Sequence, residues 1–342
     1  MRKVKLSALA LVVAILGISS TGAAPAPPEQ PPNLLGAADF ADPFVLRDGE
    51  TYFAFATGTH GRHVQLASSR DLVTWTVRED ALPALPAWAS PAPGFTWAPS
   101  VLARGDRFVL YYTTRDRTLD LQCLSRAIST RPEGPYVDDS TGPFVCQTAL
   151  CGSIDPSPFV DADGIAYLYW KSDENDRRCG APARLWGQRL TNDALGVTGP
   201  AVPLLVMDQP WEEPLIEGPS MIARDGSFHL FYSANWYESP RYAVGHAVCA
   251  SPLGPCAKSS DRPIFGSTST LLGPGGQEFF DDARGNTFVA YHAWSAPHAS
   301  YPSGGTRSLR IGRLGFEGTK PIIDPQPVSL MGSAANASAA QH

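Results

Sequence analysis

The sequence repeats one short pattern five times, and this repeat limits the possible fold more than any other feature. Each copy has an apolar stretch, then a tight-turn pair (Asp-Gly, Gly-Asp or Gly-Asn), then an alternating run rich in aromatic residues. Such a pattern is typical of a β-hairpin with a short turn. The copies begin roughly 55–65 residues apart, a period that indicates a propeller or a solenoid. They start at Asp42, Ala98, Pro156, Gly218 and Glu278.

Most copies are followed by a further strand-like run, such as "VQLASSR" or "YAVGHAVCAS". Five units of four strands predict an all-β chain that folds as a five-bladed β-propeller with four-stranded antiparallel blades. The alternative is a β-sandwich with repeated hairpins, which would not explain the same internal order in every unit. The composition agrees with many short strands, because 31 Gly and 32 Pro recur at turn-like intervals.

The charge of the chain limits its partners. The formal net charge is −6, and only 18% of the residues are charged, whereas 10% are aromatic. A nucleic-acid-binding protein would present a basic face, so we expect no nucleic-acid partner. The composition fits a neutral substrate bound by a monomer.

The two ends of the chain differ from the repeat region. Residues 1–24 have a basic start, an apolar run and small residues, the order of a secretory signal peptide. The apolar run is too short to span a membrane, so we expect a secreted protein without a membrane anchor. A Pro-rich leader is expected over residues 25–36, the propeller over residues 37–325 and a flexible tail over residues 326–342.

Six cysteines in an exported chain indicate disulfides. The absence of a Cys-x-x-Cys motif argues against a zinc site. Fifteen complete pairings are possible, and only one pair is favoured by its local context, because it brackets the turn-rich loop "ASPLGP". For the other four cysteines the sequence leaves the choice open, and we adopt a working pairing. The expected bridges are Cys249–Cys256, Cys123–Cys146 and Cys151–Cys179.

Three acidic residues stand at or just before the first strand of their units. Asp42 and Asp155 each precede a proline, and Glu217 lies in the related phrase "EGPSMIARDG". The innermost strand of each propeller blade lines the central channel, so these acids should converge at one mouth of that channel. The neighbouring proline restricts the backbone where no ladder partner is needed.

Converging carboxylates in an aromatic-rich, neutral cleft suit the cleavage of glycosides. One carboxylate must be ionised to take a proton from water, and another must hold a proton for the leaving oxygen. A third negative charge nearby helps to separate the two pKa values, because it raises the pKa of the acid.

With "WAPS" (97–100) and "YHAW" (291–294), the acidic motifs form a set that resembles glycoside hydrolase family 43 over about residues 39–321. The resemblance implies that Asp42 is the general base, Glu217 the general acid and Asp155 the residue that tunes the pKa of the acid and orients it. The family commonly has Ala after the glutamate, where this chain has Gly218. The resemblance also implies inversion at the anomeric carbon, with base and acid far enough apart to admit water.

Four further residues are expected around these acids. Trp97 is a candidate wall for stacking a sugar ring, and Phe40 is proposed for a similar part. By resemblance, Arg307 reaches the sugar hydroxyls or the acid, with Arg310 as the competing assignment. The resemblance places His292 on the propeller axis, where it can bind a structural calcium or an ordered water. We expect no cofactor to be required.

The resemblance implies a secreted, inverting hydrolase of pentose glycosides that acts on oligosaccharides or polysaccharides. We expect an exo-acting α-L-arabinofuranosidase, with β-xylosidase, endo-arabinanase and 1,3-β-galactosidase as alternatives on the same scaffold. A fructan- or sucrose-cleaving propeller would carry Asn before its first Asp-Pro and Arg before its second, but Ala41 and Ile154 stand there. A non-catalytic sugar-binding propeller would not need the acids.

Overall fold

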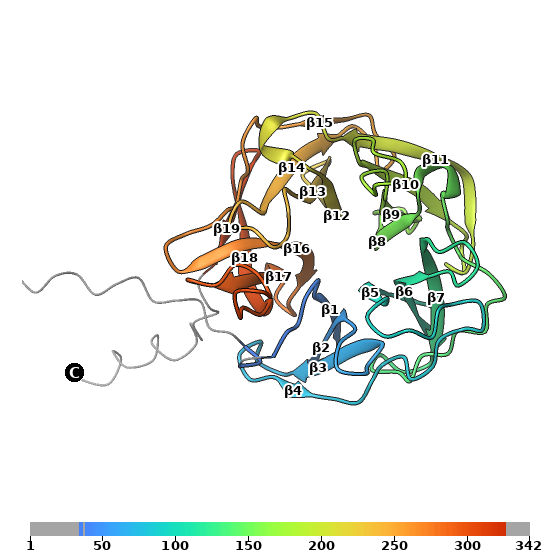
Figure 1. The fold of residues 1–342 in the computed structure, drawn as a ribbon. Helices are drawn as coiled ribbons and strands as arrows, with labels where there is room; N and C mark the ends of the chain where they lie inside the picture. The colour runs from blue at the N-terminus through green and yellow to red at the C-terminus, as the bar shows by residue number, and fades with distance from the viewer. Residues whose placement is uncertain (1–33, 37, 326–342) are drawn as a thin grey trace, which may run out of the picture.

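The computed structural model describes residues 34–36 and 38–325, which form five β-sheets around a central axis (Figure 1). The predicted five-bladed β-propeller is confirmed. In each blade the first strand lies innermost and neighbouring strands run antiparallel. The strands are β1 (Phe44–Asp48), β2 (Thr51–Thr57), β3 (Val64–Ser69) and β4 (Thr76–Val77) in blade 1; β5 (Trp97–Arg104), β6 (Arg107–Arg115) and β7 (Gln122–Ser129) in blade 2; β8 (Ser153–Val160), β9 (Ala166–Ser172), β10 (Arg184–Leu190) and β11 (Val197–Val206) in blade 3; β12 (Ile216–Arg224), β13 (Ser227–Ala234), β14 (Ala243–Cys249) and β15 (Cys256–Lys258) in blade 4; and β16 (Leu271–Asp281), β17 (Thr287–Ser295), β18 (Ser308–Glu317) and β19 (Lys320–Asp324) in blade 5.

Blade 2 differs from the other four blades at its outer edge. Its sheet has three continuous strands, and an isolated antiparallel bridge between Ile128 and Val137 stands where a fourth strand would lie. The peptide bond between Gly134 and Pro135, close to this bridge, is cis. Proline has no N–H to donate to a ladder, which limits pairing along this segment.

The repeated hairpins form as their turn residues predict. In blade 4, Arg224 pairs with Ser227 across a two-residue loop. The two loop residues, Asp225 and Gly226, have φ of 50° and 77°. Two successive positive φ angles are the requirement of the tight turn that matches the twist of a hairpin, and Asp-Gly meets it at low cost.

The core of the propeller lies between neighbouring blades. One cluster joins blade 1 to blade 5 through apolar side chains that include Ala54, Trp75, Phe288 and Leu309. The ring of described residues therefore closes by packing between two complete sheets, and no strand within residues 38–325 that follows blade 1 in the chain joins its sheet. The Phe40 N–H donates to the Arg307 carbonyl (2.7 Å), a bond that joins the segment before β1 to the segment before β18.

Two residues of the predicted leader (25–36) contact the propeller. Leu34 and Leu35 are partly buried and pack against the blade 1–blade 5 cluster. The Leu34 N–H also donates to the Leu309 carbonyl (3.4 Å). These leucines belong to the propeller because they bury apolar surface against it. The predicted signal peptide (1–24), residues 25–33 of the predicted leader and the predicted tail (326–342) lie outside the described residues.

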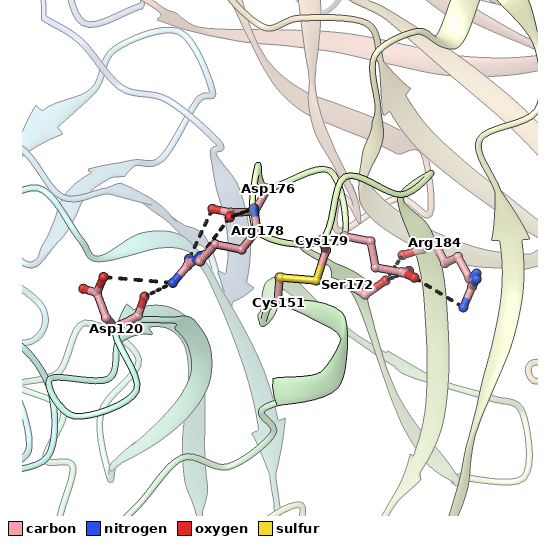
Figure 2. Close-up of a disulfide and its surroundings, with 8 residues drawn as sticks. Asp120, Cys151, Ser172, Asp176, Arg178, Cys179 and Arg184 are labelled. Atoms are coloured by element: carbon pink, nitrogen blue, oxygen red, sulfur yellow. Dashed lines mark hydrogen bonds and ion pairs between the residues drawn. A yellow bond between two sulfur atoms is a disulfide. The ribbon is translucent and has the colours of Figure 1, made fainter.

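All three expected disulfides are present. Cys249 and Cys256 face each other in the β14–β15 pair, and Cys123 on β7 is joined to Cys146. Figure 2 shows the third bridge, between Cys151 and Cys179. This bridge ties the residues that precede β8 to the loop between β9 and β10.

The same loop is also held to blade 2 by charge. Arg178 contacts Asp176 beside it and donates from Nη1 to the backbone carbonyl of Asp120 (2.8 Å), which follows β6 (Figure 2). The disulfide and Arg178 therefore fix the start of β8 and the end of β9 relative to each other and to blade 2. No helix among the described residues is long and apolar enough to cross a membrane.

Candidate active site

A short irregular element recurs where each innermost strand begins. One residue there has left-handed backbone, and in blades 1 to 4 a proline follows it. In blades 2 to 5 the pairing register shifts at the same place, as in a β-bulge, which re-aims the neighbouring side chains. The left-handed residues are Asp42 (φ 52°), Ala98 (φ 43°), Asp155 (φ 58°), Gly218 (φ 56°) and Gly276 (φ 59°).

This element shows that the three acids do not occupy equivalent positions. Asp42 and Asp155 are the left-handed residues of their blades, a conformation that aspartate adopts more readily than most residues. In blade 4 that position belongs to Gly218, and Glu217 lies one residue earlier, at the place of Trp97 in blade 2. The two aspartates therefore occupy matching positions in their blades, whereas the glutamate is offset by one residue.

The three acids nevertheless line one cleft of about 320 Å³, together with Trp97 and Arg307. This volume is at the small end of ligand-binding pockets. A larger hollow of about 980 Å³ lies beside blade 1, lined in part by β2, β3 and the segment around Arg131, and none of the predicted site residues lines it. We assign the active site to the smaller cleft, because the convergent ionisable groups lie there.

Asp42 is held as an anion by its neighbours. Its Oδ2 accepts from the Thr57 hydroxyl (2.6 Å), and its Oδ1 lies 3.3 Å from both Arg307 Nη1 and His292 Nδ1. Burial opposes ionisation, but the Arg307 guanidinium and the hydrogen bond from the Thr57 hydroxyl outweigh it. Together they hold the pKa of Asp42 well below its usual range. Asp42 is therefore ionised throughout the ordinary pH range.

Asp155 has the opposite tendency. Burial raises its pKa well above the usual range, and the negative charges of Glu217 and Asp42 add to this effect. The nearby Lys171 and a hydrogen bond from the Gly218 N–H to Asp155 Oδ2 (3.0 Å) oppose the rise without cancelling it. The Asp155 N–H donates to Thr113 Oγ1 (3.1 Å), which fixes the backbone of this residue against blade 2.

Glu217 is contacted on both carboxylate oxygens. The Tyr242 hydroxyl donates to Oε1 (2.8 Å), and Lys171 Nζ lies 3.3 Å from Oε2. The Glu217 side chain is 14% exposed, so it reaches the cleft while its oxygens remain held. The cleft thus contains one aspartate whose neighbours favour its ionised form and a second aspartate, near Glu217, whose surroundings favour its protonated form.

The model of the family described as glycosyl hydrolases family 43 matches residues 32–319. The chain belongs to this family. It is 27% identical over 281 residues to a probable arabinan endo-1,5-α-L-arabinosidase A of Aspergillus flavus, a match that covers 75% of this chain and 82% of the relative. It is 25% identical over 237 residues to the β-D-galactofuranosidase xynD of Aspergillus niger, covering 66% of this chain and 64% of that relative.

Solved structures of the same family share this fold. The crystal structure of a thermostable family-43 glycoside hydrolase aligns with a TM-score of 0.75 and 27% identity, over 85% of this chain and 95% of that one. The family membership makes this chain a glycosidase, so the alternative of a non-catalytic sugar-binding propeller is set aside.

Of the two aromatic residues expected to stack on the sugar, one lines the cleft and the other does not. Trp97 lines the cleft, is partly exposed and donates from Nε1 to the Gly94 carbonyl (2.7 Å), so its ring has a fixed orientation. Phe40 does not line this cleft. It is 2% exposed and packs in the blade 1–blade 5 core. The prediction of a stacking role for Phe40 is therefore wrong, because its ring is used to close the propeller.

Arg307 is preferred over Arg310 by its position. The Arg307 guanidinium contacts Asp42 and lies over the rings of Tyr237 (4.8 Å) and Tyr301 (5.7 Å), whereas Arg310 is buried on β18 and donates to Ser295 Oγ (2.9 Å). The aromatic rings favour a cation between them. The residue that Arg307 contacts is Asp42, the predicted base.

His292 lies on β17 next to Asp42, whose N–H donates to its Nδ1 (3.1 Å). Burial lowers the pKa of His292, so the ring is neutral, and its buried Nε2 has no hydrogen-bond partner among the described residues. No group of three or more His, Cys, Asp or Glu side chains that could hold a metal ion occurs in the described part of the chain. With Nδ1 accepting from the Asp42 N–H, Nε2 carries the ring proton and suits a water oxygen, whereas a cation at Nε2 would require the other tautomer.

Sequence reasoning missed several residues of the site. Lys171 and Tyr242 contact Glu217, while Tyr237 and Glu278 line the cleft. Lys171 ends the run "AYLYWK", where a charge follows five residues of a buried strand. A lysine in that setting is a detectable signal, because lysine is almost never fully buried without a partner. The two tyrosines offered no comparable signal among many aromatic residues.

Proposed function

We propose that the protein is a secreted, inverting, exo-acting α-L-arabinofuranosidase. The observation that carries the proposal is the contrast within the cleft between Asp42, whose carboxylate is held by the Arg307 guanidinium and the Thr57 hydroxyl, and Asp155, whose pKa is raised by burial and by the nearby Glu217 and Asp42. An inverting glycosidase needs an ionised base and a protonated acid at the same pH. Asp42 would be the base and Glu217 the acid, and Asp155 would tune and orient that acid.

The reaction then proceeds by a single displacement. Asp42 takes a proton from a water molecule as the water oxygen bonds to the anomeric carbon. Glu217 gives its proton to the glycosidic oxygen as the bond from that oxygen to the anomeric carbon breaks. The sugar leaves with inverted configuration. Arg307 keeps Asp42 ionised before the step, and Trp97 provides an apolar face for the sugar ring.

The substrate class is supported by the relatives and by the size of the cleft. The A. flavus relative is described as a probable arabinan endo-1,5-α-L-arabinosidase and the A. niger relative as a β-D-galactofuranosidase, so one name concerns arabinose and the other a furanoside. A cleft of about 320 Å³ favours binding of one terminal sugar over a long internal stretch of polymer. The expected signal peptide and the three disulfides support export to an oxidising compartment.

The test is a panel of p-nitrophenyl glycosides together with debranched arabinan. We expect the highest kcat/KM on the α-L-arabinofuranoside, lower values on the β-D-xylopyranoside and β-D-galactofuranoside, and release of single arabinose units from the polymer. NMR of the first-formed anomer should show inversion. Higher activity on another glycoside, mainly oligomeric products from arabinan, or a retained anomer would each overturn the corresponding part of the proposal.

A structural calcium near His292 is kept as a separate proposal. It is supported by the buried Nε2, which has no hydrogen-bond partner among the described residues, and it requires the tautomer in which Nδ1 carries the ring proton. Elemental analysis after dialysis against a chelator tests it. About one calcium per chain before dialysis and a lower Tm afterwards would support the ion, whereas no bound calcium and an unchanged Tm would assign the position beside Nε2 to water.

A further inference from the structure

Lys171 is a buried cation that the proposed chemistry does not yet use. It lies on β9, and its side chain is 2% exposed. Its Nζ is 3.3 Å from Glu217 Oε2 and 3.3 Å from Asp173 Oδ1. Burial opposes the charged form, but Glu217 and Asp173 outweigh it, and the pKa of Lys171 lies above its ordinary value. The lysine is therefore a fixed positive charge directly behind the expected acid.

The position of this charge is unusual for a general acid. With Lys171 on Oε2 and the Tyr242 hydroxyl on Oε1, both oxygens of Glu217 accept, which is the arrangement of an ionised carboxylate. A general acid must instead carry a proton. The neighbouring Asp155, whose pKa is raised, is able to hold that proton in the same cluster. The fixed charge beside Glu217 also acts on this neighbour, because Lys171 lowers the pKa of Asp155.

We propose that Lys171 is a positioning residue that orients the Glu217 carboxyl and, with Asp173 as its counter-charge, sets the upper pH limit of activity. This inference rests on the proposed role of Glu217 as the acid. Lys171 favours loss of the acid's proton, and the anion of Asp173 partly offsets it. The pH at which kcat/KM declines on the alkaline side would thus depend on the balance between the charges of Lys171 and Asp173, which lie two positions apart at the end of β9.

Other ionisable groups also face Glu217 and its neighbour Asp155 and belong to the background of the measurement. Asp42 and Arg307 lie on the opposite side of the cleft, and Tyr237 and Tyr242 come from blade 4. From blade 5, Glu278 Oε2 accepts from the Ser220 hydroxyl (2.7 Å), and burial raises its pKa to about 7, while the neutral His292 stacks against Tyr242. These groups are unchanged when Lys171 or Asp173 is substituted, so the sign of each shift reports on the substituted charge.

The experiment measures kcat/KM against pH for Lys171→Met and Asp173→Asn. Removing the cation should move the alkaline limb to higher pH by about one unit or more, because an opposite charge at this distance shifts a carboxyl by that amount. Removing the anion should move the limb to lower pH. Lys171→Met should also lower kcat more than it raises KM, and Lys171→Arg, which keeps the charge, should leave the limb near its wild-type position.

Lys258 provides a matched control. It is also an ion-paired lysine, partly buried, with Nζ 2.7 Å from Glu212 Oε2, but it lies on the outer strand β15. Lys258→Met should lower the Tm without moving the alkaline limb. Unmoved limbs in both Lys171→Met and Asp173→Asn, or shifts of the same sign, would overturn the proposal. If Lys171→Met does not fold, the downward shift in Asp173→Asn and the limb of Lys171→Arg decide it.

Failure of the proposed function is detected separately. If the wild-type protein cleaves none of the pentosides, the assignment of activity fails, and the lysine is then tested without turnover. The carboxyl titrations of Glu217 and Asp155 are followed by ¹³C NMR, with Glu217→Gln used to assign the Glu217 resonance. Identical titrations in wild type and Lys171→Met would overturn the influence of Lys171, whatever the substrate proves to be.

Discussion

Asp42 and Asp155 have nearly the same local structure and opposite affinities for a proton. Both are left-handed aspartates followed by proline at the start of an innermost strand, with φ of 52° and 58°. The pKa of Asp42 is held low by Arg307 and its hydrogen bonds, whereas burial and the charge of Glu217 raise that of Asp155. A propeller repeats its backbone from blade to blade, but the side chains contributed by neighbouring blades decide what each copy does.

The largest expected effect comes from removing the charge of Asp42. Asp42→Asn keeps a side chain that tolerates left-handed backbone, so the fold should persist. Turnover of the best p-nitrophenyl glycoside should fall by about 10²–10⁴-fold or more, because a general base is lost. Glu217→Gln should cause a similar loss. For both variants, calorimetry should show that sugar binding is retained. Unfolding of Asp42→Asn would make Asp42 a structural residue, and unaffected turnover in Glu217→Gln would remove it as the acid.

The second prediction makes Asp42 more like Asp155. Arg307→Met removes the cation that favours ionised Asp42, so the pKa of Asp42 should rise and the acid limb of kcat/KM should move to higher pH. We expect kcat/KM to fall by about 10-fold to 100-fold near the optimum, because a larger fraction of Asp42 is protonated and because the base is less well oriented. Arg313→Met, on the exposed side of β18, is the control and should leave the acid limb in place. An unmoved limb in Arg307→Met would contradict the electrostatic explanation.

A third prediction compares Trp97 and Phe40, two aromatic residues that were both predicted to stack on a sugar ring. Trp97→Ala should raise KM by several-fold to about 10-fold with a small change in kcat, because stacking of a ring contributes about 1 kcal/mol. Phe40→Ala should leave KM unchanged and lower the free energy of unfolding by about 3–5 kcal/mol, since it opens a cavity in the core. Steady-state kinetics and denaturant titration separate the two outcomes. A KM effect from Phe40 without loss of stability would contradict its placement.

The smallest effect on activity is expected at a buried group that lacks a compensating charge. His246 stacks on His229 within blade 4, and burial, with a contribution from His229, lowers its pKa to about 4. In the unfolded chain this histidine takes up a proton near pH 6.5. Its contribution to the free energy of unfolding should therefore be fully present above that pH and should fall by about 1–3 kcal/mol as the pH drops toward 4. Denaturant titrations at several pH values test this. His246→Gln should flatten the dependence, and an unchanged slope would contradict it.

The repeat in the sequence determined the architecture. Apolar alternation and tight-turn pairs act over a few residues, so the hairpins, the five blades and the order of the acids follow from local chemistry. The local disulfide between Cys249 and Cys256 was likewise visible, because its loop is short. The other two bridges were correct as a working choice, but the residues themselves did not exclude other pairings.

Tertiary structure alone decided how the site is charged. The contact of Lys171 with Glu217 and the burial of Phe40 depend on which blade faces which, and no local pattern encodes that. The physical reason is range. Backbone preferences are set by adjacent residues, whereas desolvation and Coulomb interactions depend on groups that are brought together only when the ring of blades closes.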